Sequence, residues 1–106
     1  MHWRLEMIKV REEQLKIIID ILNKFVPNCE VRAYGSRYKG NSREYSDLDL
    51  AIVGKEKLNW ELMAGVRGAF EESDLPFRVD VIDWHGISDE FRKVIEVGYE
   101  VLMKGT

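Results

Sequence analysis

Apolar residues recur at helical spacing along the first quarter of the chain, and charged residues fill the positions between them. This pattern predicts an amphipathic helix. Its apolar positions are Leu5, Ile8, Leu15, Ile18, Ile19, Leu22 and Phe25. Pro27 follows, and a residue that precedes proline avoids helical dihedral angles. We therefore expect a long first helix that ends before Pro27.

Short apolar runs bounded by polar turns predict strands at 29–34, 48–53 and 77–82, with a short strand or packed tail at 99–103. A second helix is expected after Asn59 and a last helix after Ser88, because both residue types cap helix N-termini. The residues expected to face inward are Leu62, Met63, Val66, Ala69 and Phe70 in the second helix, and Phe91, Val94 and Ile95 in the last.

Helices that alternate with strands predict an α/β (α+β) fold, with a small mixed β-sheet flanked by helices. The 106 residues contain no internal repeat or linker, so a single domain, 1–106, is expected. The net charge of −3 argues against an extensive nucleic-acid surface, which needs a basic face. No run approaches the ~18 apolar residues of a membrane span. With Cys29 as the only cysteine, a reducing cytoplasm is the expected location.

The most informative segment joins the first two predicted strands and reads GSRYKGNSREYSDLDL. Asp47 and Asp49 stand two residues apart where the second strand begins, so they point to one face, roughly 6–7 Å apart. Two like charges beside an apolar run raise the pKa of at least one carboxyl group. A bound Mg²⁺ ion removes this repulsion, since it prefers carboxylate oxygens together with substrate phosphates.

A third carboxylate lies in the strand 77–82, where Asp80 points away from Val79 and Val81. If this strand lies beside the second one, Asp80 joins Asp47 and Asp49. Three carboxylates on adjacent strands form a site for two hard cations. Asp83 is expected on the opposite side, as a turn or cap residue at the strand end.

The polar loop after the first strand supplies a candidate phosphate site. Gly35 lets the backbone approach a ligand closely. Ser36 and the backbone N–H groups that follow it can hold phosphate oxygens. Positive charge comes from Arg37, Lys39 and Arg43. Metal-binding carboxylates beside a phosphate cradle indicate nucleotidyl transfer, a reaction that positioning and charge stabilisation can carry.

At these residues the chain resembles a minimal nucleotidyltransferase of the DNA polymerase beta superfamily. The resemblance rests on Gly35-Ser36, a ten-residue spacer, Asp47-Leu48-Asp49, and Asp80 on a later strand, and it extends over most of the chain. It implies the nucleotidyltransferase fold, an NTP donor (ATP is expected) and two Mg²⁺ ions, with Mn²⁺ as a substitute. The site residues it implies are Asp47, Asp49 and Asp80 for catalysis and metal binding, and Gly35, Ser36, Arg37 and Arg43 for nucleotide binding.

Many small proteins that resemble this chain are paired with a HEPN-domain protein as toxin and antitoxin. The minimal nucleotidyltransferase is the antitoxin, and it can transfer AMP to a tyrosine of the HEPN ribonuclease. The resemblance therefore implies a HEPN partner as acceptor. The expected absence of a further acceptor-binding domain supports a protein acceptor. Trp3, Trp60 and Trp84 are interpreted as partly buried core residues in preference to interface residues.

Two other functions stay open at this point. One is a non-catalytic antitoxin that neutralises its partner by occlusion, and the other is a small-molecule nucleotidyltransferase. The intact motif favours catalysis over occlusion, and the lack of an acceptor domain disfavours a small-molecule acceptor. The preferred NTP, the number of nucleotides transferred and a possible homo-oligomer are left open by the sequence.

Overall fold

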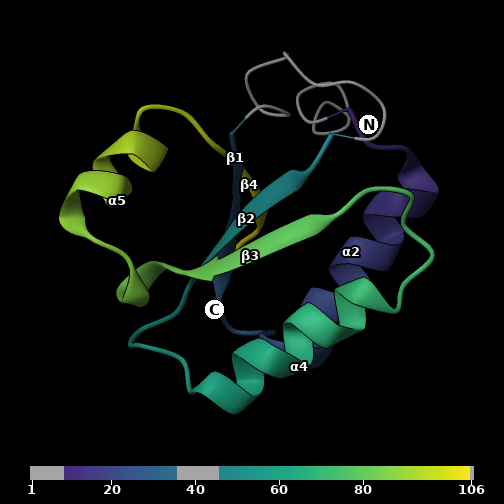
Figure 1. Ribbon diagram of the computed structural model, residues 1–106, viewed down its shortest axis with the longest axis horizontal. Helices are drawn as coiled ribbons and strands as arrows, with labels where there is room; N and C mark the ends of the chain where they lie inside the picture. The colour runs from purple at the N-terminus through teal and green to yellow at the C-terminus, as the bar shows by residue number, and fades with distance from the viewer. Residues whose placement is uncertain (1–8, 36–45, 106) are drawn as a thin grey trace.

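Four strands form one mixed sheet in the computed structural model, which describes residues 9–35 and 46–105. The strands are β1 (Glu30–Tyr34), β2 (Leu48–Val53), β3 (Val79–Asp83) and β4 (Glu100–Met103), in the order β3-β2-β1-β4. β1 pairs antiparallel with β2 and with β4, whereas β2 and β3 are parallel. The predicted small mixed sheet with flanking helices is confirmed (Figure 1).

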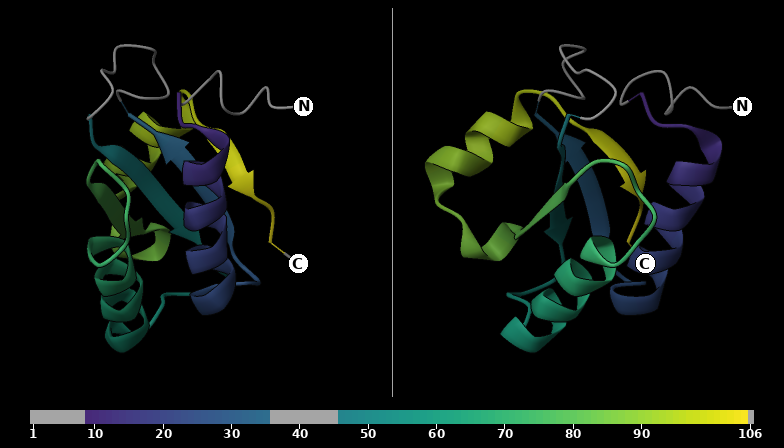
Figure 2. Two further views of the ribbon diagram at one scale, coloured as in Figure 1. Left: turned by 90° about the vertical axis from the view of Figure 1, so that its right-hand side faces the viewer. Right: turned by 45° about the vertical axis from the view of Figure 1, so that its right-hand side comes forward.

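The helices lie on both faces of this sheet. Helices α2 (Glu12–Phe25) and α4 (Trp60–Glu71) cover one face, and α5 (Asp89–Glu96) covers the other (Figures 1 and 2). Strand alternation divides the side chains between the faces. The main core, on the α2 and α4 side, includes Ile18, Leu22, Val31, Ala33, Leu48, Leu50, Ile52, Met63, Val66, Phe70 and Val81. A smaller core on the α5 side is built on Ala51, Trp84 and Ile95.

The helix boundaries follow the capping residues. The Asn59 side chain accepts a hydrogen bond from the Leu62 N–H at 2.7 Å, and Ser88 accepts one from the Phe91 N–H at 3.1 Å. Both predicted N-caps are therefore confirmed. The first helix ends at Phe25, before Pro27, as expected.

That first helix begins later than predicted. Arg11 has extended dihedral angles and Lys9 has a φ of 59°, so the helix starts only at Glu12. Leu5, Ile8 and Trp3 lie outside the described residues. The third strand is also shifted, to Val79–Asp83, because its last residue still pairs with Ile52 of β2.

The last helix buries less of its surface than predicted. Ile95 is buried, but Val94 is 59% exposed and Phe91 is 36% exposed, so the expectation that all three face inward is wrong for Val94. The Phe91 ring packs against the Tyr34 ring, edge to face, with the ring centroids 6.0 Å apart. Ile95 alone anchors the apolar side of the helix in the core.

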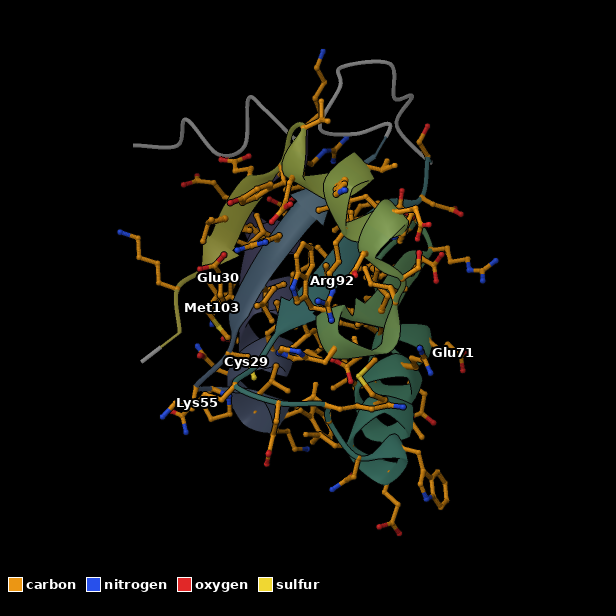
Figure 3. All side chains as sticks on the ribbon, turned by 90° about the vertical axis from the view of Figure 1, so that its left-hand side faces the viewer. Cys29, Glu30, Lys55, Glu71, Arg92 and Met103 are labelled. Carbon is orange, nitrogen blue, oxygen red and sulfur yellow. The ribbon has the colours of Figure 1, made fainter. Side chains whose placement is uncertain are left out.

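Three cation–π contacts add to the limited apolar burial on this side of the sheet. Arg92 of α5 points toward the sheet (Figure 3), donates to the Trp84 carbonyl at 3.0 Å, and stacks over the Trp84 ring at 5.5 Å. Arg32 of β1 lies over the rings of Trp84 and Tyr99, at 4.7 and 4.5 Å.

The tryptophans differ from one another in burial. Trp84 is buried, as expected, whereas Trp60 is 78% exposed at the first position of α4, so its assignment to the core is wrong.

Across residues 9–35 and 46–105, the helices are too short and polar for any of them to cross a bilayer.

Candidate active site

Three strands bring polar side chains into one row on the α5 face of the sheet. Asp49 of β2 pairs with Asp80 of β3 in the parallel register, and with Tyr34 of β1 in the antiparallel register. Residues paired across neighbouring strands point to the same face, and the strands are ~4.8 Å apart. The two aspartates therefore stand side by side, and this part of the predicted site geometry is present.

Asp47 lies just before β2 and is exposed, while Asp49 is half-buried. The pKa of Asp49 is raised, chiefly by burial and then by the charges of Asp80 and Asp47. The charges of Asp80 and Asp47 thus act on the Asp49 carboxyl group. This repulsion is a cost that a bound cation would relieve.

Tyr34 is a site residue that sequence reasoning did not single out. Burial, followed by the charges of Asp49 and Asp80, raises the pKa of Tyr34 to about 12. Its hydroxyl therefore stays protonated at neutral pH and remains a neutral neighbour of the two carboxylates. The signal available in the sequence was its position directly before Gly35, at the end of β1.

Gly35 is required by the geometry of the same site. Its φ of +82° is a conformation that residues with a Cβ atom rarely adopt, and an added Cβ would overlap Oδ2 of Asp49. The turn backbone thus lies against the Asp49 carboxylate. The other residues predicted to bind nucleotide, Ser36, Arg37 and Arg43, together with Lys39, lie outside the described residues.

Arg78 is a second residue that the sequence analysis missed. It precedes Asp80 by two positions, and the Leu48 N–H donates to its carbonyl at 2.9 Å, which extends the β2–β3 pairing. Its charge lowers the pKa of Asp49 and so opposes the effect of the neighbouring aspartates. The sequence signal for Arg78 is its position two residues before Asp80, which places both side chains on the same face of the strand.

The carboxylates of the site fit a hard cation that takes its remaining ligands from water and substrate. Among residues 9–35 and 46–105, no group of three His, Cys, Asp or Glu side chains is placed to hold a metal ion by itself. Adjacent Asp49 and Asp80 carboxylates offer oxygen ligands only. Mg²⁺ is commonly bound in this way, by one or two carboxylates plus water and substrate phosphates.

Asp83, three residues after Asp80, has the structural role that the sequence predicted. Its carboxylate accepts hydrogen bonds from the Leu58 N–H at 2.8 Å and the His85 N–H at 3.1 Å. It thereby ties the connection that precedes α4 to the end of β3.

Replacing Asp83 and Asp80 separately tests whether Asp83 is the structural residue of β3 and Asp80 the site residue. Asp83→Ala removes two hydrogen bonds to a charged acceptor and should lower the free energy of unfolding by about 2–4 kcal/mol. Asp80→Ala should not lower the free energy of unfolding, because Asp80 is exposed and its charge repels Asp49. Urea denaturation of the two variants measures the difference, and a stability loss at Asp80 equal to that at Asp83 would contradict these roles.

Comparison with known proteins identifies the family. The family described as "Polymerase beta, Nucleotidyltransferase" matches residues 16–104. A protein of Haemophilus influenzae described as "Probable protein adenylyltransferase MntA" is 43% identical over 97 residues, which cover 92% of this chain and 85% of that protein.

Two solved structures have the same fold. One is a toxin–antitoxin crystal structure with AMP-PNP, with 22% identity, a TM-score of 0.65, and coverage of 87% of this chain and 74% of the other. The second is a tri-AMPylated Shewanella oneidensis HEPN toxin in complex with MNT antitoxin, with 21% identity, a TM-score of 0.61, and coverage of 90% and 73%. The family match and the identity to the Haemophilus protein show that this chain belongs to the polymerase beta nucleotidyltransferase family.

Proposed function

We propose that this chain is a Mg²⁺-dependent protein adenylyltransferase that transfers AMP from ATP to a tyrosine hydroxyl of a HEPN-domain toxin and so acts as its antitoxin. The observation that carries the proposal is the pairing of Asp49 with Asp80 beside the Gly35 turn, in a chain of this family. Asp47, Asp49 and Asp80 are assigned to metal binding and catalysis. Gly35, Ser36, Arg37 and Arg43 are assigned to the nucleotide.

The reaction requires one bond to form and one to break. The acceptor oxygen forms a bond to the α-phosphorus of ATP and releases its proton. The bond between the α-phosphorus and the oxygen that bridges to the β-phosphate breaks, and pyrophosphate leaves. When bound, Mg²⁺ would lower the pKa of the acceptor hydroxyl and neutralise charge on the triphosphate. The chain's own contribution is to hold both substrates in line at Asp49 and Asp80, and positioning of this kind supplies a large part of the rate.

The partner is proposed from the relatives. The Haemophilus protein is described as a protein adenylyltransferase, and the Shewanella complex contains a HEPN toxin that carries AMP groups. The toxin–antitoxin structure with AMP-PNP supports an adenine nucleotide as donor. We place the activity in the cytoplasm, where ATP is available and the buried Cys29 stays reduced.

A transfer assay tests the proposal. The chain is incubated with Mg²⁺, ATP labelled at the α- or the γ-phosphate, and a HEPN-domain protein from the same organism. Only the α-label should appear on a tyrosine of the HEPN protein, and EDTA or the double variant Asp47→Asn, Asp49→Asn should abolish it. Labelling by the double variant would contradict the metal mechanism.

Two further outcomes would replace the proposal with an alternative. If the inactive double variant still binds the toxin and protects cells fully, occlusion explains the antitoxin effect. If α-label appears on a small molecule but not on protein, the chain is a small-molecule nucleotidyltransferase.

A further inference from the structure

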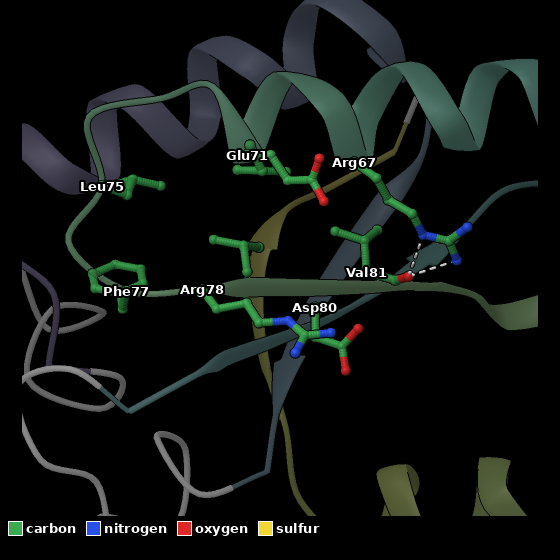
Figure 4. Close-up of a pocket in the computed structure, with 9 residues that line it drawn as sticks. Arg67, Glu71, Leu75, Phe77, Arg78, Asp80 and Val81 are labelled. Atoms are coloured by element: carbon green, nitrogen blue, oxygen red, sulfur yellow. Dashed lines mark hydrogen bonds between the residues drawn. The ribbon is translucent and has the colours of Figure 1, made fainter.

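A hollow of about 340 Å³ opens beside Asp80, between α4 and the outer edge of β3 (Figure 4). Its volume falls within the range of ~300–1,000 Å³ that is usual for ligand sites. It is lined by Arg67, Phe70, Glu71, Leu75, Phe77, Arg78, Val79, Asp80 and Val81. Since Asp80 belongs to this lining, the hollow borders the proposed catalytic row at the edge of β3, and the Asp80 side chain lies on the opposite face of that strand (Figure 4).

The hollow runs along a sheet edge with backbone groups directed into it. β3 is the last strand of the described sheet on this side. The Arg78 carbonyl accepts from β2, so the backbone groups of the next residue, Val79, point outward. The Val81 carbonyl also points outward, where it accepts from the Arg67 guanidinium at 2.9 and 3.3 Å.

The side chains around this edge combine an apolar floor with charged rims. Phe70 and Phe77 are buried beneath it, and Leu75 is half-buried. Figure 4 shows Arg67 and Glu71 reaching down from α4, and Arg78 and Asp80 on the other side of β3. An extended peptide suits these features, since sheet edges bind main chains and apolar pockets bind alternate side chains. When one residue of such a peptide fills the hollow, the next residue points to the Asp80 face of β3.

The order of the strands indicates which substrate uses this side. The Gly35 turn ends β1 and lies against Asp49 from one side, whereas β3 and the hollow lie on the other. If the triphosphate binds at the Gly35 turn, the attacking hydroxyl has to come from the opposite side, because the attacking and leaving oxygens are roughly in line. That side is the one occupied by Asp80.

We propose that the hollow is the acceptor subsite, in which an extended, tyrosine-bearing segment of the partner protein lies along the edge of β3. The segment pairs with the Val79 backbone, and one of its apolar side chains lies on the apolar floor. The neighbouring tyrosine then points to the opposite face of β3, where its hydroxyl reaches the α-phosphate beside Asp80. This assignment rests on the proposed function and adds to it the surface that selects the acceptor. Arg67 supports the subsite by fixing the Val81 carbonyl.

Two adjacent glutamates at the end of α4 provide a matched test. Both are exposed, but only Glu71 lines the hollow. Glu71→Trp should fill the hollow and lower kcat/KM for the HEPN acceptor at least tenfold, with the affinity for Mg·AMP-PNP unchanged within twofold by calorimetry. Glu72→Trp should match the wild type in both measurements. Equal transfer by the two variants would overturn the proposal.

A cross-linking measurement separates this proposal from the proposed function. Benzoylphenylalanine in place of Glu71 should cross-link to the partner peptide that contains the AMP-accepting tyrosine, and in place of Glu72 it should not. If Glu71→Trp loses its fold, this result still decides the case. A cross-link at that peptide without any AMP transfer would leave the docking surface standing and refute the enzyme activity, whereas transfer with a cross-link elsewhere would refute only the subsite.

Discussion

Asp49→Asn is expected to lower AMP transfer by about 10²–10³-fold or more, the scale that follows from removing one group that stabilises developing charge. The Asn side chain keeps the shape of Asp49 but removes the charge that would hold a cation beside Asp80. Because the carboxylate pair is formed by the β2–β3 register, the fold should persist in the variant. Transfer of α-labelled AMP and circular dichroism measure the two effects.

The same substitution should act in the opposite direction on stability when no metal is present. Burial and the charges of Asp80 and Asp47 raise the pKa of Asp49, so the folded state binds its proton more tightly than the unfolded state does. The wild type then loses stability as the pH rises from the ordinary aspartate pKa through the raised one. In EDTA, Asp49→Asn should therefore melt at a higher temperature than the wild type near pH 7.

Acid and Mg²⁺ should each remove this advantage of the variant. Below the ordinary pKa of aspartate both proteins carry a neutral side chain at position 49, so their melting temperatures should converge. Mg²⁺ with AMP-PNP should stabilise the wild type and not the variant, since a ligand stabilises the state that binds it. A wild type more stable than the variant in EDTA at pH 7 would contradict the repulsion described here.

Gly35→Ala is expected to produce the second large loss, at least about 10²-fold in AMP transfer, because even ~1 Å of misplacement at a reacting centre can have that effect. The added Cβ would overlap Oδ2 of Asp49 and force that carboxylate to move. The positive φ adds a conformational cost of about 1–2 kcal/mol in the free energy of unfolding. Transfer kinetics and urea denaturation measure both quantities.

Gly68→Ala is the matched control for this substitution. Gly68 lies inside α4, and a Cβ added there meets no atom within 4 Å. Alanine at this helical position should raise the free energy of unfolding by up to about 1 kcal/mol and leave AMP transfer unchanged. Normal transfer by Gly35→Ala would show that the turn does not need to lie against Asp49.

Local signals in the sequence predicted most of the elements. Asn59 and Ser88 marked helix starts because their side chains satisfy the first N–H groups, and the apolar run at 48–53 matched β2. The placement of Asp80 beside Asp49 was conditional, since it needed β3 to be the neighbour of β2. Consecutive strands tend to be neighbours in a sheet, which favoured a position of β3 beside β2 but did not establish it.

The features that sequence reasoning missed arise from tertiary contacts. Val94 has the spacing of a core residue, yet α5 reaches the sheet mainly through Ile95 and Arg92, so Val94 is left exposed. The hollow at β3 depends on the distance of α4 from a sheet edge, which no periodicity encodes. Arg78 could have been found, because its alternation with Asp80 places both on one face.

The central claim is that the Asp49 and Asp80 carboxylates together hold the metal that serves AMP transfer. Anomalous diffraction from crystals grown with Mn²⁺ and AMP-PNP tests it most directly. The account predicts a manganese peak within about 2.1–2.3 Å of oxygens from both carboxylates and from the nucleotide phosphates. A nucleotide bound with its metal ligated elsewhere, or with no peak beside Asp80, would contradict it.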